Sequence, residues 1–349
     1  MGAARRSNPL LTRALGCAAA VAALVVVAAA VACGGGTTSE EGAAPQPIEV
    51  ALDWFPNPDH VALYYALDRG YFADRGLDVE LRTPSDPAAG LKLVATNNFD
   101  LAVYYEGDLF LAAQEGLPVV AVGALVPTAL NSLIALADSK VSGPSTLAGA
   151  TIGVAGLPFD DAILETIRRK QGLSEDDVRS INVGFDLVPA LLARQVDAVI
   201  GAYFNIEGTL LELQTGKPPH VTRLEELGVP PYDELVIVAN RDRLRDDAAY
   251  ADAVREFLAG MIEGTEKSRA DTPGSEALME MQTEYTPEEL AGMVPTTLSL
   301  LGAPGDRHPG CFDLGGWERF GKWMLENGLL ESPVAAAEVA TNAYLPGCD

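Results

Sequence analysis

Short apolar runs alternate along the chain with segments whose apolar residues recur at helical spacing. Nine runs have the length and composition of strands: residues 47–54, 77–83, 100–105, 119–126, 132–137, 151–156, 181–185, 197–203 and 234–240. Segments 60–70, 160–172 and 187–195 lie between them and have the spacing of helices. Strands and helices in alternation predict an α/β protein with parallel sheets that helices cover on both faces.

The C-terminal third follows a different pattern. No strand-like run comes after Asn240, and segments with helical spacing, such as 250–271 and 315–328, take over. The sequence Thr-Pro-Glu-Glu at 286–289 is a capping signal that predicts the start of another helix. About 300 residues follow the N-terminal leader, more than one core usually organises, so we expect two lobes.

Residues 1–33 have the layout of an export signal. Three arginines without an acid precede an apolar run that ends at Cys33. Residues 30–33, Ala-Val-Ala-Cys, resemble a bacterial lipoprotein cleavage site. This resemblance predicts that Cys33 is lipidated and that residues 34–47 form a flexible tether. Plain signal cleavage and an uncleaved membrane anchor are the alternatives. Each version places the folded part outside the cytoplasm.

The charge and cysteine content narrow the classes of partner. The formal charge is -25, and it becomes -28 without the leader, which contains three of the 24 basic residues and none of the 49 acidic ones. Such a surface repels phosphate backbones, so we expect no nucleic-acid partner. Cys311 and Cys348 are the cysteines left in the folded part, and we predict a disulfide between them, with two unpaired buried thiols as the alternative. The cysteine spacing and the three histidines predict no metal site.

Aromatic side chains, amides and carboxylates gather where the predicted strands end. In open α/β sheets, ligands bind beyond the carboxyl ends of strands. Aromatic walls with amides and acids, and without cations, suit an uncharged or weakly cationic heteroaromatic ligand. The candidate ligand-binding residues are Trp54, Asn57, His60, Tyr105, Glu106, Asn131, Asp160, Tyr203, Phe204, Asn205, Glu207 and Tyr232.

Most of these candidates have a structural alternative. Trp54 could belong to the core, and Asn57 stands between two prolines, where it could form a turn. His60, Asp160 and Asn205 each stand at the start of a predicted helix, where capping alone would explain them. The chain has no phosphate-binding glycine motif, and it has none of the serine- or metal-hydrolase motifs that we sought.

Several blocks in order carry a family resemblance, among them "LDWFPNPDH", "RGYFADRGLDVELRTPSDP", "LNSLIALADS" and "VGFDLVPALLARQVDAVIGAYFNIEG". Between about Val50 and Asn240 the chain resembles solute-binding proteins of ABC importers for thiamine pyrimidine precursors, the hydroxymethylpyrimidine and formylaminopyrimidine binders. The resemblance implies a periplasmic-binding-protein type II fold with the ligand in the cleft between two lobes. The first lobe would comprise 48–137 and 235–349 and the second 138–234, with a hinge at the crossings near Ala137 and Leu235.

The same blocks resemble pyridoxal-dependent pyrimidine synthases of thiamine biosynthesis. Those enzymes have a lysine and a histidine after the third strand, where this chain has Tyr104 and Asp108, and a cysteine cluster that is absent here. Without the lysine no Schiff base forms. We therefore expect no enzymatic activity and no cofactor. Phe204 stands where the pyrimidine binders usually have tryptophan, which keeps riboflavin open as an alternative ligand.

The resemblance assigns roles to the candidate residues. Trp54, Tyr105 and Tyr203 or Phe204 would stack on the ring, while Asn57, Asn131, Asn205 and Glu207 would contact its nitrogens and amino group, and Asp160 and Tyr232 would close the second lobe. The expected partners are a membrane permease and its ATPase, with a membrane receptor as the alternative. We expect a monomer, because a binding protein must close freely.

Overall fold

The computed structural model describes residues 44–302 and 308–348. The predicted export signal and Cys33 lie outside these residues, as does most of the tether. The first strand begins at Gln46, two residues inside the predicted tether. Among the described residues, no helix combines the length and the apolar character that crossing a membrane requires.

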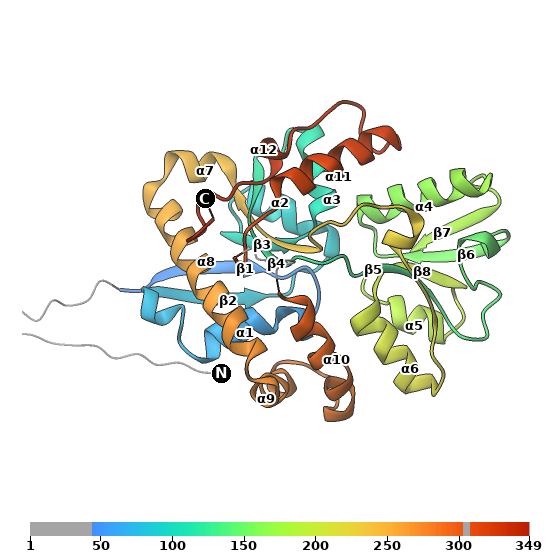
Figure 1. The fold of residues 1–349 in the computed structure, drawn as a ribbon, viewed down its shortest axis with the longest axis horizontal. Coiled ribbons are helices and arrows are strands. Elements are labelled where there is room, and N and C mark those ends of the chain that lie inside the picture. The colour runs from blue at the N-terminus through green and yellow to red at the C-terminus, as the bar shows by residue number, and fades with distance from the viewer. Residues whose placement is uncertain (1–43, 303–307, 349) are drawn as a thin grey trace, which may run out of the picture. The chain divides into compact units, whose positions relative to one another are not determined.

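The described residues form ten strands and twelve α-helices (Figure 1). The strands are β1 Gln46–Ala51, β2 Leu77–Arg82, β3 Leu101–Tyr104, β4 Val119–Val126, β5 Asn131–Ala135, β6 Ala150–Val154, β7 Val178–Asn182, β8 Ala198–Tyr203, β9 His220–Arg223 and β10 Leu235–Asn240. The helices are α1 Val61–Asp68, α2 Gly90–Ala95, α3 Glu106–Gln114, α4 Pro158–Gln171, α5 Leu187–Leu192, α6 Thr209–Thr215, α7 Arg241–Asp246, α8 Ala248–Arg269, α9 Thr272–Gln282, α10 Pro287–Leu300, α11 Leu314–Glu326 and α12 Ala336–Val339.

Two sheets organise two lobes. The first sheet has the order β2-β1-β3-β10-β4 and the second β7-β6-β8-β5-β9. Figure 1 shows the two sheets side by side, each with helices packed around it. The pairs β1–β2, β1–β3, β6–β7 and β6–β8 are parallel, as the alternation of strands and helices predicts. The predicted α/β class with two lobes is confirmed.

One antiparallel strand in each sheet comes directly from a crossing between the lobes. The chain leaves β4 in the first sheet and enters the second as β5, which pairs antiparallel with β8 and β9. It returns through β10, which pairs antiparallel with β3 and β4. The first crossing is therefore at residues 127–130, earlier than the position predicted near Ala137. Residues 131–135 pair with β8 and β9 of the second sheet. Both strands come much later in the chain, so no local signal shows that the crossing is already complete at residue 131.

The sequence pattern missed one strand. β9 is a four-residue strand at the edge of the second sheet, and all four of its side chains are half-buried. Its sequence, His-Val-Thr-Arg, contains no apolar run, so nothing local separates it from a loop. Pairing with β5 decides its conformation.

Two local signals in the C-terminal part formed as expected. Thr286 and Glu289 make a reciprocal capping box at the start of α10, with each side chain accepting a hydrogen bond from the backbone N–H of the other residue. Cys311 and Cys348 are joined by a disulfide, with Cα atoms 5.7 Å apart. This bond attaches the C-terminal tail to the segment that precedes α11.

Candidate functional site

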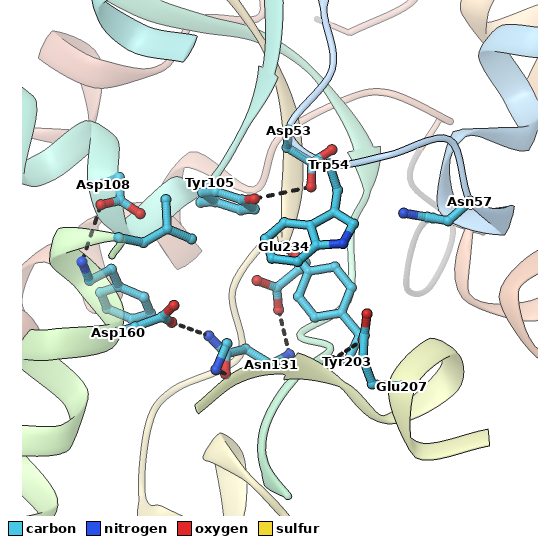
Figure 2. Close-up of a pocket in the computed structure, with 13 residues that line it drawn as sticks. Asp53, Trp54, Asn57, Tyr105, Asp108, Asn131, Asp160, Tyr203, Glu207 and Glu234 are labelled. Atoms are coloured by element: carbon cyan, nitrogen blue, oxygen red, sulfur yellow. Dashed lines mark hydrogen bonds between the residues drawn. The ribbon is translucent and has the colours of Figure 1, made fainter. Parts of the chain in front are cut away.

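A narrow cavity lies where strand ends and crossings of the two lobes meet (Figure 2). Its volume is about 20 Å³, measured as the space open to the centres of water molecules. Such a volume holds roughly one water molecule. The lining residues are Asp53, Trp54, Asn57, Tyr105, Asp108, Asn131, Leu157, Phe159, Asp160, Gly201, Tyr203, Glu207 and Glu234. The residues come from both lobes, so the width of the cavity depends on how closely the lobes approach.

Five carboxyl groups line this small space, and none of the lining residues is a lysine or an arginine. Burial of several carboxylates together is costly, because each loses solvation and repels the others. Burial is accordingly the largest cause that raises the pKa of Asp108, Glu207 and Glu234, each to about 7. The cavity therefore holds carboxyl groups that exchange protons close to neutral pH.

Asp53 is fully engaged by its neighbours. His60 Nε2 lies 2.7 Å from Asp53 Oδ1, and the Tyr105 hydroxyl donates to Asp53 Oδ2 at 3.1 Å. The backbone N–H of Asn57 donates to His60 Nδ1 at 3.3 Å. His60 thus contacts the Asn57 backbone with one ring nitrogen and Asp53 with the other. His60 therefore orients Asp53.

Glu234 joins the two crossings. Its Oε2 accepts hydrogen bonds from the backbone N–H groups of Leu130 and Asn131, at 2.6 and 2.8 Å, and from the Tyr232 hydroxyl at 2.8 Å. Residues 130 and 131 end the first crossing, and Glu234 ends the second. Because Glu234 also lines the cavity, a ligand that contacts it would act on the segments that link the lobes.

Asp108 and Asp160 each accept fewer hydrogen bonds than these two acids, and each has one buried oxygen without a partner. Asp108 Oδ1 accepts from the backbone N–H of Phe159 at 3.1 Å, and Asp160 Oδ1 accepts from Asn131 Nδ2 at 2.7 Å (Figure 2). Both Oδ2 atoms are buried and have no hydrogen-bond partner. Burial raises the pKa of Asp160 well above its usual value, and the nearby charge of Asp108 raises it further. Two carboxyl oxygens are thus available to a ligand.

Gly201 allows Asp160 to take this position. The residue lies in β8 with φ +96°, and a Cβ atom there would be 2.4 Å from Asp160 Oδ2. Its N–H donates to Asn131 Oδ1 at 3.0 Å. Both polar atoms of the Asn131 amide are therefore used, one by Gly201 and one by Asp160. Asn131 therefore positions Asp160, and it also lines the cavity.

The structure places the predicted residues in two sets. Trp54, Asn57, Tyr105, Asn131, Asp160, Tyr203 and Glu207 line the cavity. His60, Glu106, Phe204, Asn205 and Tyr232 are not among the lining residues. Their direct contact with a ligand, expected from the sequence, is not supported by these positions. Asp160 makes no side-chain cap on α4, although it lies in the first turn of that helix, where the helix dipole favours an acid.

The residues outside the lining have other contacts. Glu106 Oε2 accepts from the N–H of Asp233 at 2.7 Å, and both Glu106 and Tyr232 line a separate cavity of about 250 Å³. The Phe204 ring lies under the guanidinium of Arg223, 4.5 Å from its centroid. Phe204 is not part of the cavity wall. Its phenyl ring therefore does not widen the cavity for a larger ligand such as riboflavin.

Asn205 contacts elements outside the second sheet. Its Nδ2 donates to Asp59 Oδ1 at 2.8 Å and to Thr297 Oγ1 at 2.9 Å. Asp59 precedes α1 in the first lobe, and Thr297 lies in α10. Asn205 is in a π-helical turn, Phe204–Gly208, and makes no N-cap there. The amide ties the second lobe to the first and to α10.

Six lining residues were not among the sequence candidates: Asp53, Asp108, Leu157, Phe159, Gly201 and Glu234. Some carried a usable signal. Asp53 directly precedes Trp54 at the end of the first strand, and Asp108 occupies the position where the synthases have a histidine. Phe159 and Leu157 are ordinary apolar residues, and only their place at the start of α4 brings them to the cavity.

The fold and the cavity between the lobes define a class, the two-lobe solute-binding proteins. The ligand-binding component of an ABC-type import system from Staphylococcus aureus has a similar structure, with a TM-score of 0.66 and 12% sequence identity over 87% of this chain and 99% of that chain. The alkanesulfonate-binding protein SsuA from Xanthomonas axonopodis pv. citri is similar at a TM-score of 0.65 and 15% identity, over 86% of this chain and 99% of that one.

Sequence comparison gives the family. The profile described as NMT1/THI5 like matches residues 57–272. A "putative thiamine biosynthesis protein" of Haemophilus influenzae is 35% identical over 85% of this chain and 92% of its own length. The formylaminopyrimidine-binding protein of Halalkalibacterium halodurans is 32% identical over 83% and 88%. The chain belongs to the NMT1/THI5-like family.

More distant members of the family include enzymes. The 4-amino-5-hydroxymethyl-2-methylpyrimidine phosphate synthase of Uromyces fabae is 25% identical over 65% of this chain and 68% of its own length. Family membership therefore includes both binding proteins and synthases, and the residues of the cavity have to distinguish them.

Proposed function

We propose that this protein is the substrate-binding component of an ABC importer and that its ligand is a pyrimidine precursor of thiamine. The proposal is supported by the two relatives that are at least 32% identical, whose names refer to thiamine biosynthesis and to formylaminopyrimidine binding. The two-lobe fold agrees with it. The protein would capture the pyrimidine outside the cytoplasm and deliver it to a membrane permease.

The proposal of an aminopyrimidine as the ligand rests on one observation about the cavity. Asp108 and Asp160 each have a buried oxygen without a partner, and the cavity that they line has aromatic walls from Trp54, Tyr105 and Tyr203. An aminopyrimidine is flat and has an amino donor beside a ring-nitrogen acceptor. A carboxylate accepts from the amino group, and a neighbouring protonated carboxyl donates to the ring nitrogen. Burial and the charge of Asp108 raise the pKa of Asp160 well above its usual value, so Asp160 would be the protonated donor, and Asp108, whose pKa is about 7, would be the carboxylate.

Binding would be coupled to movement of the lobes. A cavity of about 20 Å³ is far smaller than an interior cavity of roughly 150 Å³ that is able to bind benzene. The lobes must therefore separate to admit a pyrimidine and then close on it. Because a ligand between the lobes touches both, it stabilises one arrangement of them, and this arrangement would be the signal that a permease recognises.

The synthase alternative lacks a reactive group in the cavity. A pyridoxal-dependent enzyme needs a lysine for its Schiff base, and no lysine is among the lining residues. We therefore propose a binding protein without catalytic activity. Incubation with pyridoxal phosphate and turnover to a pyrimidine phosphate would revive the synthase alternative.

The membrane attachment and the oligomeric state remain proposals from the sequence. We propose lipidation at Cys33, an extracytoplasmic location and a monomer. Cys33→Ser should release the protein from washed membranes into the soluble fraction if the lipid is the attachment. Retention of the variant in the membrane would favour an uncleaved apolar anchor instead.

A thermal-shift panel tests the ligand directly. The full chain in mild detergent is heated with formylaminopyrimidine, 4-amino-5-hydroxymethyl-2-methylpyrimidine, thiamine or riboflavin. A ligand present at about 100 times its dissociation constant should add roughly 2.7 kcal/mol to the free energy of unfolding. Stabilisation by an aminopyrimidine supports the proposal. Stabilisation by riboflavin alone would overturn the ligand and leave the importer class intact.

A further inference from the structure

Three aromatic rings meet at Trp54, one of the walls of the cavity. Trp54 and Phe55 follow β1 in the first lobe, and Phe185 follows β7 in the second. The Phe185 ring centroid is 4.7 Å from that of Trp54, with the planes at 78°, and 4.7 Å from that of Phe55, with the planes at 47°. Aromatic rings attract each other in such edge and tilted arrangements. We call these three residues the aromatic clasp.

The clasp extends from the inside of the cavity to the surface. Trp54 lines the cavity, whereas Phe55 is 53% exposed and Phe185 is partly exposed. Trp54 also packs against the small apolar cluster of the second lobe that contains Leu187 and Val188. Trp54, a side chain of the first lobe, therefore packs against the second lobe.

The second lobe presents Phe185 on a tight turn. The N–H of Asp186 donates to the carbonyl of Val183 at 3.0 Å, which closes a four-residue turn between β7 and α5. Gly184 takes φ +55° at its second position, a conformation that glycine adopts without strain. The Asn182 side chain accepts from the Gly184 N–H at 2.8 Å. These bonds hold Phe185 toward the first lobe.

We propose that the aromatic clasp is a gate, with Phe185 as the positioning residue that closes the cavity over its ligand. The inference rests on the proposed function, since it describes how the same site retains a pyrimidine. The Trp54 ring is at once a wall of the cavity and the surface on which Phe185 rests. A compact pyrimidine that stays inside the wall leaves this contact intact. A pyrimidine with a second ring, such as thiamine, would keep Phe185 away from Trp54.

The gate predicts which kinetic constants respond to Phe185→Ala. Loss of two aromatic pairs should raise the dissociation rate of formylaminopyrimidine about 10-fold, equivalent to about 1.4 kcal/mol. The same contacts also hold the cavity closed before binding, so the association rate should rise as well. We expect this rise to be smaller than that of the dissociation rate. Thiamine, if it binds, should dissociate at nearly the same rate from both proteins. Ile181→Ala, an exposed apolar truncation at the end of the same strand, is the matched control.

A second measurement needs no ligand. In a Trp323→Phe background the tryptophans are Trp54 and Trp317, of which Trp317 is 2% exposed. Quenching of the fluorescence by acrylamide then reports on Trp54. Phe185→Ala should increase the quenching of the full chain, and Ile181→Ala should not.

The two measurements separate the gate from the proposed function. Increased quenching without binding of any pyrimidine by the wild-type chain would support the gate and overturn the pyrimidine ligand. Unchanged quenching in Phe185→Ala would overturn the gate whatever the ligand. Pyrimidine binding with a dissociation rate that Phe185→Ala leaves unchanged would also overturn the gate and leave the proposed function standing.

Discussion

The carboxyl groups of the cavity fall into two regions that differ in how their oxygens are used. Asp53 and Glu234 receive hydrogen bonds from the chain itself, through His60, Tyr105, the backbone of the first crossing and Tyr232. Asp108 and Asp160 each accept one bond and keep one buried oxygen free. A carboxylate that accepts several hydrogen bonds stabilises the lobes and crossings that surround it, whereas a buried carboxyl oxygen without a partner costs stability until a ligand supplies the missing donor.

The difference has a meaning for function. Buried polar atoms without partners are rare in native structures, and each one requires an explanation. Two of them facing one cavity are best explained by a ligand with hydrogen-bond donors. We therefore predict that substitutions of Asp53 or Glu234 mainly alter stability. Substitutions of Asp108 or Asp160 should mainly alter ligand binding.

The largest expected effect is on stability, from Glu234→Ala. The change removes the acceptor for two backbone N–H groups and for the Tyr232 hydroxyl. We expect the free energy of unfolding to fall by roughly 2 to 4 kcal/mol, because buried donors without acceptors cost about 1 to 3 kcal/mol each and water can replace some of the bonds. Urea unfolding measures the loss. Tyr232→Phe, which removes one donor and leaves the carboxylate, should cost less than half as much. Equal losses in the two variants would contradict the role of Glu234 at the crossings.

The next largest effect is on binding, from Asp108→Asn. The amide keeps an acceptor for the Phe159 N–H and replaces the free oxygen by a donor. We expect affinity for an aminopyrimidine to fall by about 2 kcal/mol, roughly 30-fold, with stability unchanged or higher. Isothermal titration calorimetry measures the affinity. Asp161→Asn, an exposed acid in the first turn of α4, is the control and should bind as the wild type does. Wild-type affinity in Asp108→Asn would remove Asp108 from the proposed ligand contacts.

Glu207 combines features of both groups of carboxyl residues. One of its oxygens accepts from the Tyr203 N–H at 2.7 Å, and the residue lines the cavity. Glu207→Gln should weaken an aminopyrimidine by about 1 to 3 kcal/mol if the other oxygen binds the ligand through a charge-assisted hydrogen bond. The same titration provides the test. Unchanged affinity would leave Glu207 with the structural task of holding the Tyr203 backbone.

A pH dependence of stability is expected without any substitution. The folded-state pKa values of Asp108, Glu207 and Glu234 are raised to about 7, so the folded chain binds more protons than the unfolded chain between about pH 4.5 and 7. Stability is then highest below this range and falls as the pH rises through it, by at most about 1.4 kcal/mol per pH unit for each group. Urea unfolding at pH 5, 6, 7 and 8 should show the decline.

A variant of one of these acids sharpens the pH test. Asp108→Asn keeps an acceptor for the Phe159 N–H and removes one titrating group. Its stability should therefore decline less steeply with pH than that of the wild type. A wild-type stability that stays level between pH 5 and 8 would show that these carboxyl groups ionise with ordinary pKa values in the folded protein.

The sequence predicted much of the fold because its signals are local. The strand runs matched the strands except β7 and β9, and the capping box of α10 was visible in four residues. The run predicted at 181–185 overlaps β7, Val178–Asn182, only at its last two residues. The position of the first crossing was not predictable, because β5 looks like a continuation of the first lobe until it pairs with β8 and β9. β9 was missed for the same reason, since four residues without an apolar run form a strand only beside a partner.

The candidate site was predictable in part. The rule that ligands bind at strand ends located Trp54, Tyr105, Asp160 and Tyr203 at the cavity. It could not tell Tyr203 from its neighbour Phe204, since a turn after a strand can direct either ring inward. It also gave no sign that the Asn131 side chain is hydrogen-bonded to Asp160 and Gly201. Likewise, the hydrogen bonds from Asn205 to Asp59 and Thr297 could not be foreseen.

The sequence by itself determined the order of the elements, the α/β class, the family and the accumulation of acids and aromatic rings at the strand ends. Periodicity, caps and motifs act over a few residues, so they can be recognised without a partner. The tertiary structure decided which carboxyl oxygens are saturated, where the chain crosses between the lobes, and that Phe185 meets Trp54. These properties depend on contacts between segments distant in the chain, where burial and the available hydrogen-bond partners are set by packing.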